Sequence, residues 1–203
     1  MTRVEKAAPP RLSGHGIGAK LRDMASKPPD AAKLYEAALN HLARFAATEA
    51  GLAQVLARKL ERWGRLYAGE DADAEEVAAE VRRARAAIPG VIARLREAGV
   101  LNDAAFAAAR AKRLTRQGKS RRAALAHLAA KGVARPVLAE DPRRELAAAC
   151  AYLRRRRAGP FGEAPEDKIM AAMARGGFSQ EVTRRALRLD RAEAEELIKE
   201  LHA

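Results

Sequence analysis

The sequence predicts an all-α protein: an elongated, curved array of three tandem three-helix repeats that follows a disordered N-terminal tail. Alanine accounts for 50 of the 203 residues, and alanine combines the highest helix propensity with little surface to bury. Valine, isoleucine and aromatic residues, which favour strands, are sparse. Short amphipathic stretches are separated by glycine, proline and helix-capping residues at similar intervals.

The first segment, residues 1–30, is predicted to be the disordered tail. It contains four prolines and three glycines and has no helical periodicity. The glycine-rich stretch GHGIG at 14–18 has no strand before it and no Lys-Ser or Lys-Thr after it. A phosphate-binding loop is therefore not indicated.

Residues 31–100 are predicted to form the first repeat, with an inserted helix near 75–88. Asp30 is a candidate cap for its first helix. Its second helix is predicted to end at Trp63-Gly64, and the inserted helix at Pro89-Gly90, because glycine and proline are common helix ends. A short helix over 91–98 completes the repeat.

Residues 101–142 are predicted to form the second repeat. Either Asn102 or Asp103 caps a helix that ends near Gln117-Gly118, and Ser120 caps the next helix. Gly132 should follow that helix as its C-terminal cap. A third, short helical piece is expected between Arg135-Pro136 and Asp141-Pro142.

Residues 143–190 are predicted to form the third repeat, and residues 191–203 a C-terminal helix. The break AGPFGEAP separates a helix that ends at Arg157 from one over 166–175. Ser179 and Asp190 are the candidate caps of the last two helices.

The repeats align on three glycines, Gly64, Gly132 and Gly177. An apolar residue lies four positions before each glycine, and another residue of the same face lies four positions earlier still. Chance matches within an alanine-rich helical chain are the alternative explanation. Repeats of this kind stack on their neighbours and produce an extended array.

The charge is concentrated in the middle of the chain. The formal net charge is +13, and the segment from Arg110 to Arg157 alone contains 15 basic and 3 acidic residues. This density favours contact with phosphates or an acidic protein face over a merely solvated surface. The candidate filament- and DNA-binding residues are Arg110, Lys112, Arg113, Arg116, Lys119, Arg121, Arg122, Lys131, Arg154, Arg155, Arg156 and Arg157.

The sequence does not predict an enzyme. The four histidines lie in different segments without metal-ligand spacing, and His127 is interpreted as a boundary residue. We expect no catalytic residues, no metal, no cofactor and no small-molecule substrate. The single cysteine, Cys150, is interpreted as a buried core residue. It excludes an internal disulfide and fits a reducing compartment, and no apolar run suits a membrane. A cytoplasmic monomer is therefore expected.

The order of short motifs in the chain resembles the RecX family of bacterial recombination regulators, from about residue 34 to 190. The elements that carry this resemblance are Leu95, Gly99, Leu101, Asp103, Phe106-Ala107, Arg116, Gly118-Lys119, Leu128, Lys131-Gly132, Asp167-Lys168-Ile169 and Gly176-Gly177-Phe178. The chain departs from the family pattern in the inserted helix near 75–88 and at Pro142.

The resemblance implies a non-enzymatic regulator that binds the RecA filament on single-stranded DNA. It implies modulation, with inhibition the expected direction, of RecA in recombination, DNA repair and the SOS response. No individual contact residue follows from it; the twelve basic candidates rest on charge alone.

Two other functions fit the residues. One is a sequence-independent module that binds the DNA phosphate backbone without a RecA target, and the other is a scaffold whose basic face meets an acidic protein. Base stacking on aromatic side chains is not indicated, because aromatic residues do not alternate with the basic ones. A membrane-surface helix lacks the apolar face that it would need.

Overall fold

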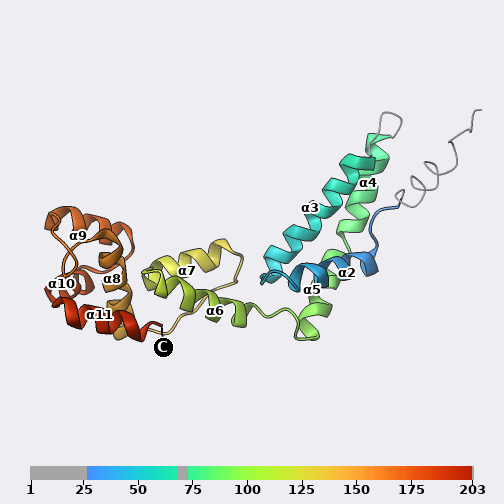
Figure 1. The fold of residues 1–203 in the computed structure, drawn as a ribbon. Coiled ribbons are helices and arrows are strands. Elements are labelled where there is room, and N and C mark those ends of the chain that lie inside the picture. The colour runs from blue at the N-terminus through green and yellow to red at the C-terminus, as the bar shows by residue number, and fades with distance from the viewer. Residues whose placement is uncertain (1–26, 68–72, 203) are drawn as a thin grey trace, which may run out of the picture. The chain divides into compact units, whose positions relative to one another are not determined.

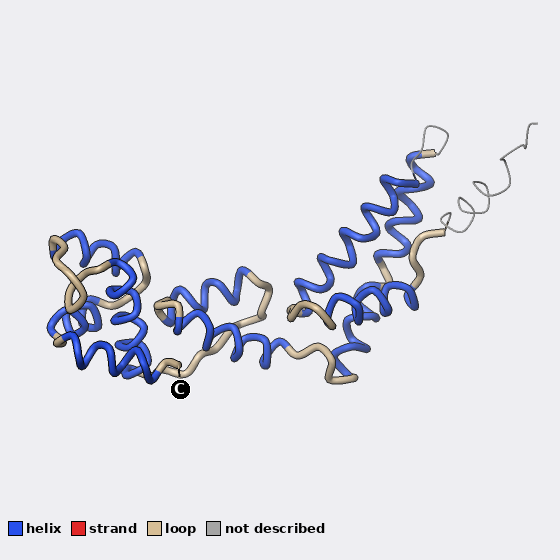
Figure 2. The backbone as a smooth tube through the Cα atoms, in the orientation of Figure 1, coloured by secondary structure: helices blue, strands red, loops and turns tan. Residues whose placement is uncertain are grey.

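The chain is all-helical over the residues that the computed structural model describes, 27–67 and 73–202 (Figures 1 and 2). No strand occurs in these ranges apart from a single bridge between Gly159 and Gly162. Of the predicted tail 1–30, residues 1–26 lie outside the described residues. Residues 27–30 are described and precede the first helix. The helices are α2 (Ala31–Leu42), α3 (Glu49–Tyr67), α4 (Ala74–Arg85), α5 (Ile88–Glu97), α6 (Asp103–Arg116), α7 (Arg121–Ala130), α8 (Pro142–Arg156), α9 (Glu166–Arg175), α10 (Gln180–Arg188) and α11 (Arg191–Glu200).

The described residues divide into two compact units, one formed by residues 27–38, 55–67 and 73–91, the other by residues 39–54 and 92–202. In the first unit, the prediction that a helix ends at Gly64 is wrong, because α3 continues to Tyr67. A Cβ atom at Gly64 would lie 2.9 Å from a methyl group of Val81. Gly64 therefore lets α4 approach α3 near the C-terminal end of α3 and does not end the helix.

The prediction that Pro89-Gly90 ends the inserted helix is also wrong. The helix α4 ends at Arg85, and Pro89 and Gly90 lie in the first turn of α5. The first N–H groups of a helix have no partner within the helix, so the missing N–H of a proline costs nothing there.

The second unit is built around α8, which contacts α6, α10 and α11. Seven residues of α8 are buried, among them Leu146, Cys150 and Leu153. They pack in one apolar cluster with residues such as Met173 and Ile198. In Figure 1, α8 to α11 gather into one group and α6 lies beside α7. Small alanine side chains allow the close packing of α8 within this cluster.

The same hydrogen-bonded joint occurs twice in the second unit. Thr48, at the N-terminus of α3, donates its hydroxyl to the carbonyl of Lys131 at 2.6 Å and accepts from the N–H of Gly51. Ser120, at the N-terminus of α7, donates to the carbonyl of Gly176 at 2.7 Å and accepts from the N–H of Ala123. Each hydroxyl therefore caps its own helix and also satisfies a carbonyl at the end of another helix.

A glycine follows the accepting carbonyl in both joints. A Cβ atom at Gly132 would lie 2.4 Å from the Cβ of Ala50, and one at Gly177 would lie 2.5 Å from the hydroxyl of Ser120. Thr48 and Ser120 are almost fully buried, with 2% and 0% of their surface exposed. The glycines are required because no side chain fits between the two helix ends.

Of the two candidate caps of α6, Asn102 is the one that caps this helix, whereas Asp103 caps a different helix. Asn102 accepts from the N–H of Ala105 and caps α6. Asp103 accepts from the N–H of Glu49 at 2.8 Å, so its carboxylate caps α3 across the fold. The predicted caps Ser120, Ser179 and Asp190 are confirmed.

The short third helix predicted between Arg135 and Pro142 is absent. This segment bends at Arg135, which adopts a positive φ of 47°, and has no regular secondary structure from there to Asp141. Pro136 disfavours the helical conformation at the residue before it. Pro142 instead starts α8, where Asp141 accepts from the N–H of Arg144 and caps the helix.

Candidate nucleic-acid interface

The twelve basic residues predicted to bind a filament or DNA lie on α6, α7 and α8 and on the segments that follow each of these helices. All are exposed or half-buried. Their side chains differ in what they contact, and these contacts divide the set into groups with different roles.

Four arginines donate to backbone carbonyls of other segments, and we call them the carbonyl-bound arginines. Their contacts tie α6 to α11, α7 to the segment before α8, α7 to α9, and α8 to the end of α6. The pairs are Arg116 Nε with Leu201 at 3.0 Å, Arg121 Nε with Leu138 at 2.9 Å, Arg122 Nη2 with Ala174 at 3.3 Å, and Arg155 Nη1 with Gln117 at 2.7 Å. These guanidinium groups hold helix ends together.

Six cations make no side-chain hydrogen bond or ion pair with the described part of the chain. They are exposed, and we call them the unpartnered cations. They are Lys112, Arg113, Lys119, Lys131, Arg154 and Arg157. Their positive charge is available to an external partner.

The remaining two basic residues contact ring systems. The guanidinium of Arg156 lies over the ring of Tyr152, 4.7 Å from its centroid. Arg110 donates from Nε to Nε2 of His127 at 3.0 Å. Burial and the nearby charges of Arg110, Lys131 and Lys119 lower the pKa of His127, so its imidazole is neutral at pH 7.

The structure does not bring the cations of α6 onto one face. Ala107, Ala111 and Leu114 form the buried side of this helix. Arg110 reaches α7 from one flank, whereas Arg116 reaches α11 from the other. The basic residues therefore surround the exposed part of α6 and do not form a single stripe.

At least two N–H groups at the N-terminus of α7 have partners within the chain. Ser120 accepts from the N–H of Ala123, and Glu145 accepts from the N–H of Arg121 at 2.9 Å. Desolvation raises the pKa of the Glu145 carboxyl, and the Arg121 contacts oppose that shift. An anion cannot use those two donors without displacing these groups.

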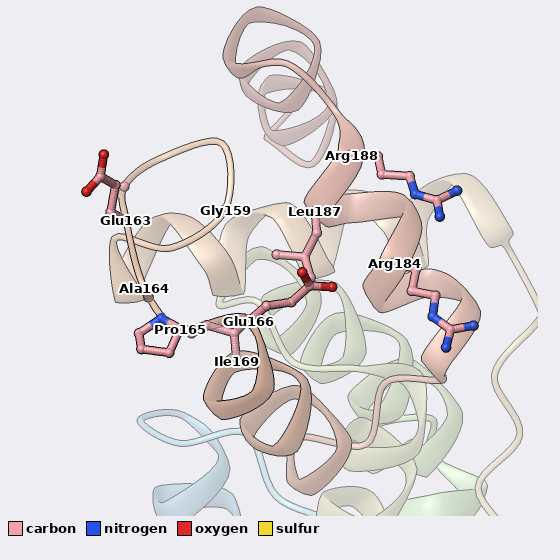
Figure 3. A pocket seen from close by; sticks show the side chains of 10 residues that line it. Gly159, Glu163, Ala164, Pro165, Glu166, Ile169, Arg184, Leu187 and Arg188 are labelled. Atoms are coloured by element: carbon pink, nitrogen blue, oxygen red, sulfur yellow. The ribbon is translucent and has the colours of Figure 1, made fainter.

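An open pocket of about 720 Å³ lies between α9, α10 and the loop before α9. Figure 3 shows Arg184 and Arg188 on one side of it and Glu163 on the other. Two carboxylates, from Glu163 and Glu166, line the pocket together with the two arginines. This mixture of charges is less suited to a phosphate backbone than the exposed cations of α6 to α8 are.

The described residues contain no group of three or more histidine, cysteine or acidic side chains able to hold a metal. None of the helices in ranges 27–67 and 73–202 is long and apolar enough to span a membrane. Sequence reasoning missed the partnership of Arg110 with His127. The two residues are 17 positions apart, and nothing in the sequence marks them as neighbours.

The Cys150 thiol is expected to be unreactive in the folded protein. It is buried, and burial raises its pKa to about 11. A thiolate is the reactive form, so we expect alkylation at about pH 8 to be at least ~100-fold slower in the native protein than in denaturant. Mass spectrometry of timed iodoacetamide reactions measures this ratio. Equal rates would contradict the buried position of the thiol.

Comparison with known proteins assigns the chain to a family. No protein-family model and no solved structure matches it. The regulatory protein RecX of Myxococcus xanthus (strain DK1622) is 32% identical over 166 residues, which cover 76% of this chain and 83% of that protein. Identity at this level over most of both chains agrees with the ordered motifs between residues 34 and 190. The chain belongs to the RecX family of regulatory proteins.

Proposed function

We propose that this protein binds RecA filaments on single-stranded DNA and inhibits RecA activity in recombination and DNA repair. The observation that carries the proposal is the relationship to RecX over most of the chain. The six unpartnered cations support it, because a nucleoprotein filament offers both DNA phosphates and acidic protein side chains. Binding should therefore weaken as salt is raised.

The paired joints support the further proposal that the chain is assembled from tandem three-helix repeats. In each joint a capping hydroxyl at the start of one helix binds a carbonyl just before a glycine. The joint at Ser120 ties the N-terminus of α7 to the C-terminus of α9, so it fixes their spacing. Basic segments held in this way can match successive sites along a partner without a large ordering cost.

The test is the ATPase rate of RecA on single-stranded DNA, titrated with this protein at low and high salt. We expect loss of ATPase activity at amounts well below one molecule per RecA, and a weaker effect at high salt. Inhibition that appears only when the DNA is saturated with this protein would contradict action on the filament.

The alternative is a sequence-independent module that binds the DNA backbone and has no RecA target. Its support is that exposed, unpartnered cations suit any polyanion. Under this alternative the protein retards bare DNA in a gel, with a steep salt dependence, and leaves the RecA ATPase rate unchanged. The two measurements together separate the functions.

A further inference from the structure

Arg110 on α6 and His127 on α7 form a pair in which a cation donates to a neutral imidazole. The Nε–H of Arg110 points at Nε2 of His127, with 3.0 Å between the nitrogen atoms. Both residues are half-buried. Nε2 can accept this hydrogen bond only while it carries no proton, so the geometry requires the neutral form of His127.

The charges that act on His127 are all positive. They come from Arg110 on α6, from Lys119 in the turn before α7 and from Lys131 after α7. Lys119 and Lys131 have no side-chain partner in the described part of the chain. No acidic side chain is among the charges that shift the pKa of His127.

We infer that Arg110 and His127 form a subsite for one backbone phosphate of single-stranded DNA, and that His127 takes up a proton when the phosphate binds. The inference rests on the proposed function, which supplies single-stranded DNA as the ligand. A phosphodiester carries one negative charge, which offsets the repulsion among the cations.

The proton comes from solvent and is bound at Nε2 of His127. Once Nε2 is protonated, it can no longer accept the hydrogen bond from Arg110. The guanidinium then becomes free to donate to the phosphate oxygens. The imidazolium becomes a second donor to the same anion. Free His127 has a pKa below its ordinary value because of burial and the neighbouring cations, and a bound anion opposes the effect of those cations.

A phosphate backbone suits the subsite better than a single carboxylate does. Arg110 contacts the imidazole directly, and unpartnered cations lie before and after α7 at Lys119 and Lys131 and along α6 at Lys112 and Arg113. A DNA strand carries a phosphate at every nucleotide, so neighbouring phosphates can reach those further cations.

The first measurement is the titration of the His127 ring by NMR in the full-length protein, alone and with oligothymidylate. Thymine has no group that titrates near neutral pH, so any change in the His127 titration comes from the binding site. We expect the oligonucleotide to raise the pKa of His127 by about one unit. An unchanged His127 titration in the saturated complex would overturn the inference.

The second measurement is the affinity for the same oligonucleotide at about pH 5.5 and about pH 7.5. We expect wild-type protein to bind about tenfold more tightly at the lower pH. His127→Gln retains an acceptor for Arg110 but does not titrate, so its two affinities should agree within about twofold. Lys112→Gln is the control, since it removes a cation outside the subsite and should keep the wild-type ratio.

The inference would be overturned if the ratio of the affinities at the two pH values were the same in wild-type and His127→Gln protein. It would also be overturned if the protein did not bind oligothymidylate. If polyglutamate raises the pKa of His127 and oligothymidylate does not, the subsite binds a protein carboxylate and the inference is wrong. RecA is absent from all these experiments. Their failure is therefore distinguishable from failure of the proposed regulation, which the ATPase titration tests.

Discussion

Replacing all six unpartnered cations by glutamine is expected to weaken the binding of single-stranded DNA by roughly a hundredfold or more at ~0.1 M salt. These side chains have no partner within the described chain, so their loss removes no internal contact. The free energy of unfolding should therefore change by less than about 1 kcal/mol. Inhibition of RecA should weaken in parallel if it depends on the same contacts.

The salt dependence of binding gives the sharper measurement. For a single strand, each lost phosphate contact reduces the slope of log affinity against log salt by about 0.7, so loss of six contacts reduces it by about 4. Binding isotherms over a range of salt concentrations measure this slope, and chemical denaturation measures stability on the same proteins.

The matched control is glutamine at the four carbonyl-bound arginines, Arg116, Arg121, Arg122 and Arg155. Each of these variants loses a hydrogen bond to a carbonyl of another segment. We expect the free energy of unfolding to fall by about 1 kcal/mol per arginine, with a smaller change in the salt slope. Equal changes in slope for the two sets would show that internal partners do not decide which cations bind DNA.

Replacing Gly132 by alanine is expected to lower the free energy of unfolding by about 3 kcal/mol. The new Cβ would lie 2.4 Å from the Cβ of Ala50, which belongs to a helix and cannot rotate away. The φ of 83° adds a cost of its own for any side chain. The two helix ends must separate, so the hydrogen bond from Thr48 to the Lys131 carbonyl is lost as well.

Gly99→Ala separates the backbone cost from the contact. Gly99 has a similar φ of 69°, but a Cβ atom there meets nothing within 4 Å. We expect this variant to lose only about 1–2 kcal/mol, the cost of the left-handed conformation. Chemical denaturation of both variants gives the difference. Equal losses would mean that the joint tolerates a side chain and does not hold the two helices together.

The helical class, most helix bounds and the main caps could be predicted from the sequence because they depend on neighbours within about four residues. Ser120, Ser179 and Asp190 cap helices through N–H groups three positions later. The helix over 166–175 has its predicted bounds for the same reason. The concentration of positive charge is also a property of the sequence alone.

At Gly64 and at the two joints, a distant segment decides the role of a residue. Gly64 looked like a helix end, but Val81 of another helix explains why a glycine is present. Ser120 could be recognised as a helix cap, whereas the hydrogen bonds that Thr48 and Ser120 donate depend on carbonyls 83 and 56 residues away. Periodicity contains no information about such partners.

The candidate site divides in the same way between sequence and tertiary structure. All twelve basic residues could be identified from the sequence, since charge is intrinsic to each side chain. Which of them are unpartnered was decided only by the fold. Carbonyl partners lie between 17 residues away, for Arg121 with Leu138, and 85 residues away, for Arg116 with Leu201. A guanidinium binds whichever carbonyl is brought within reach by the packing of the helices, and this packing is a property of the whole chain.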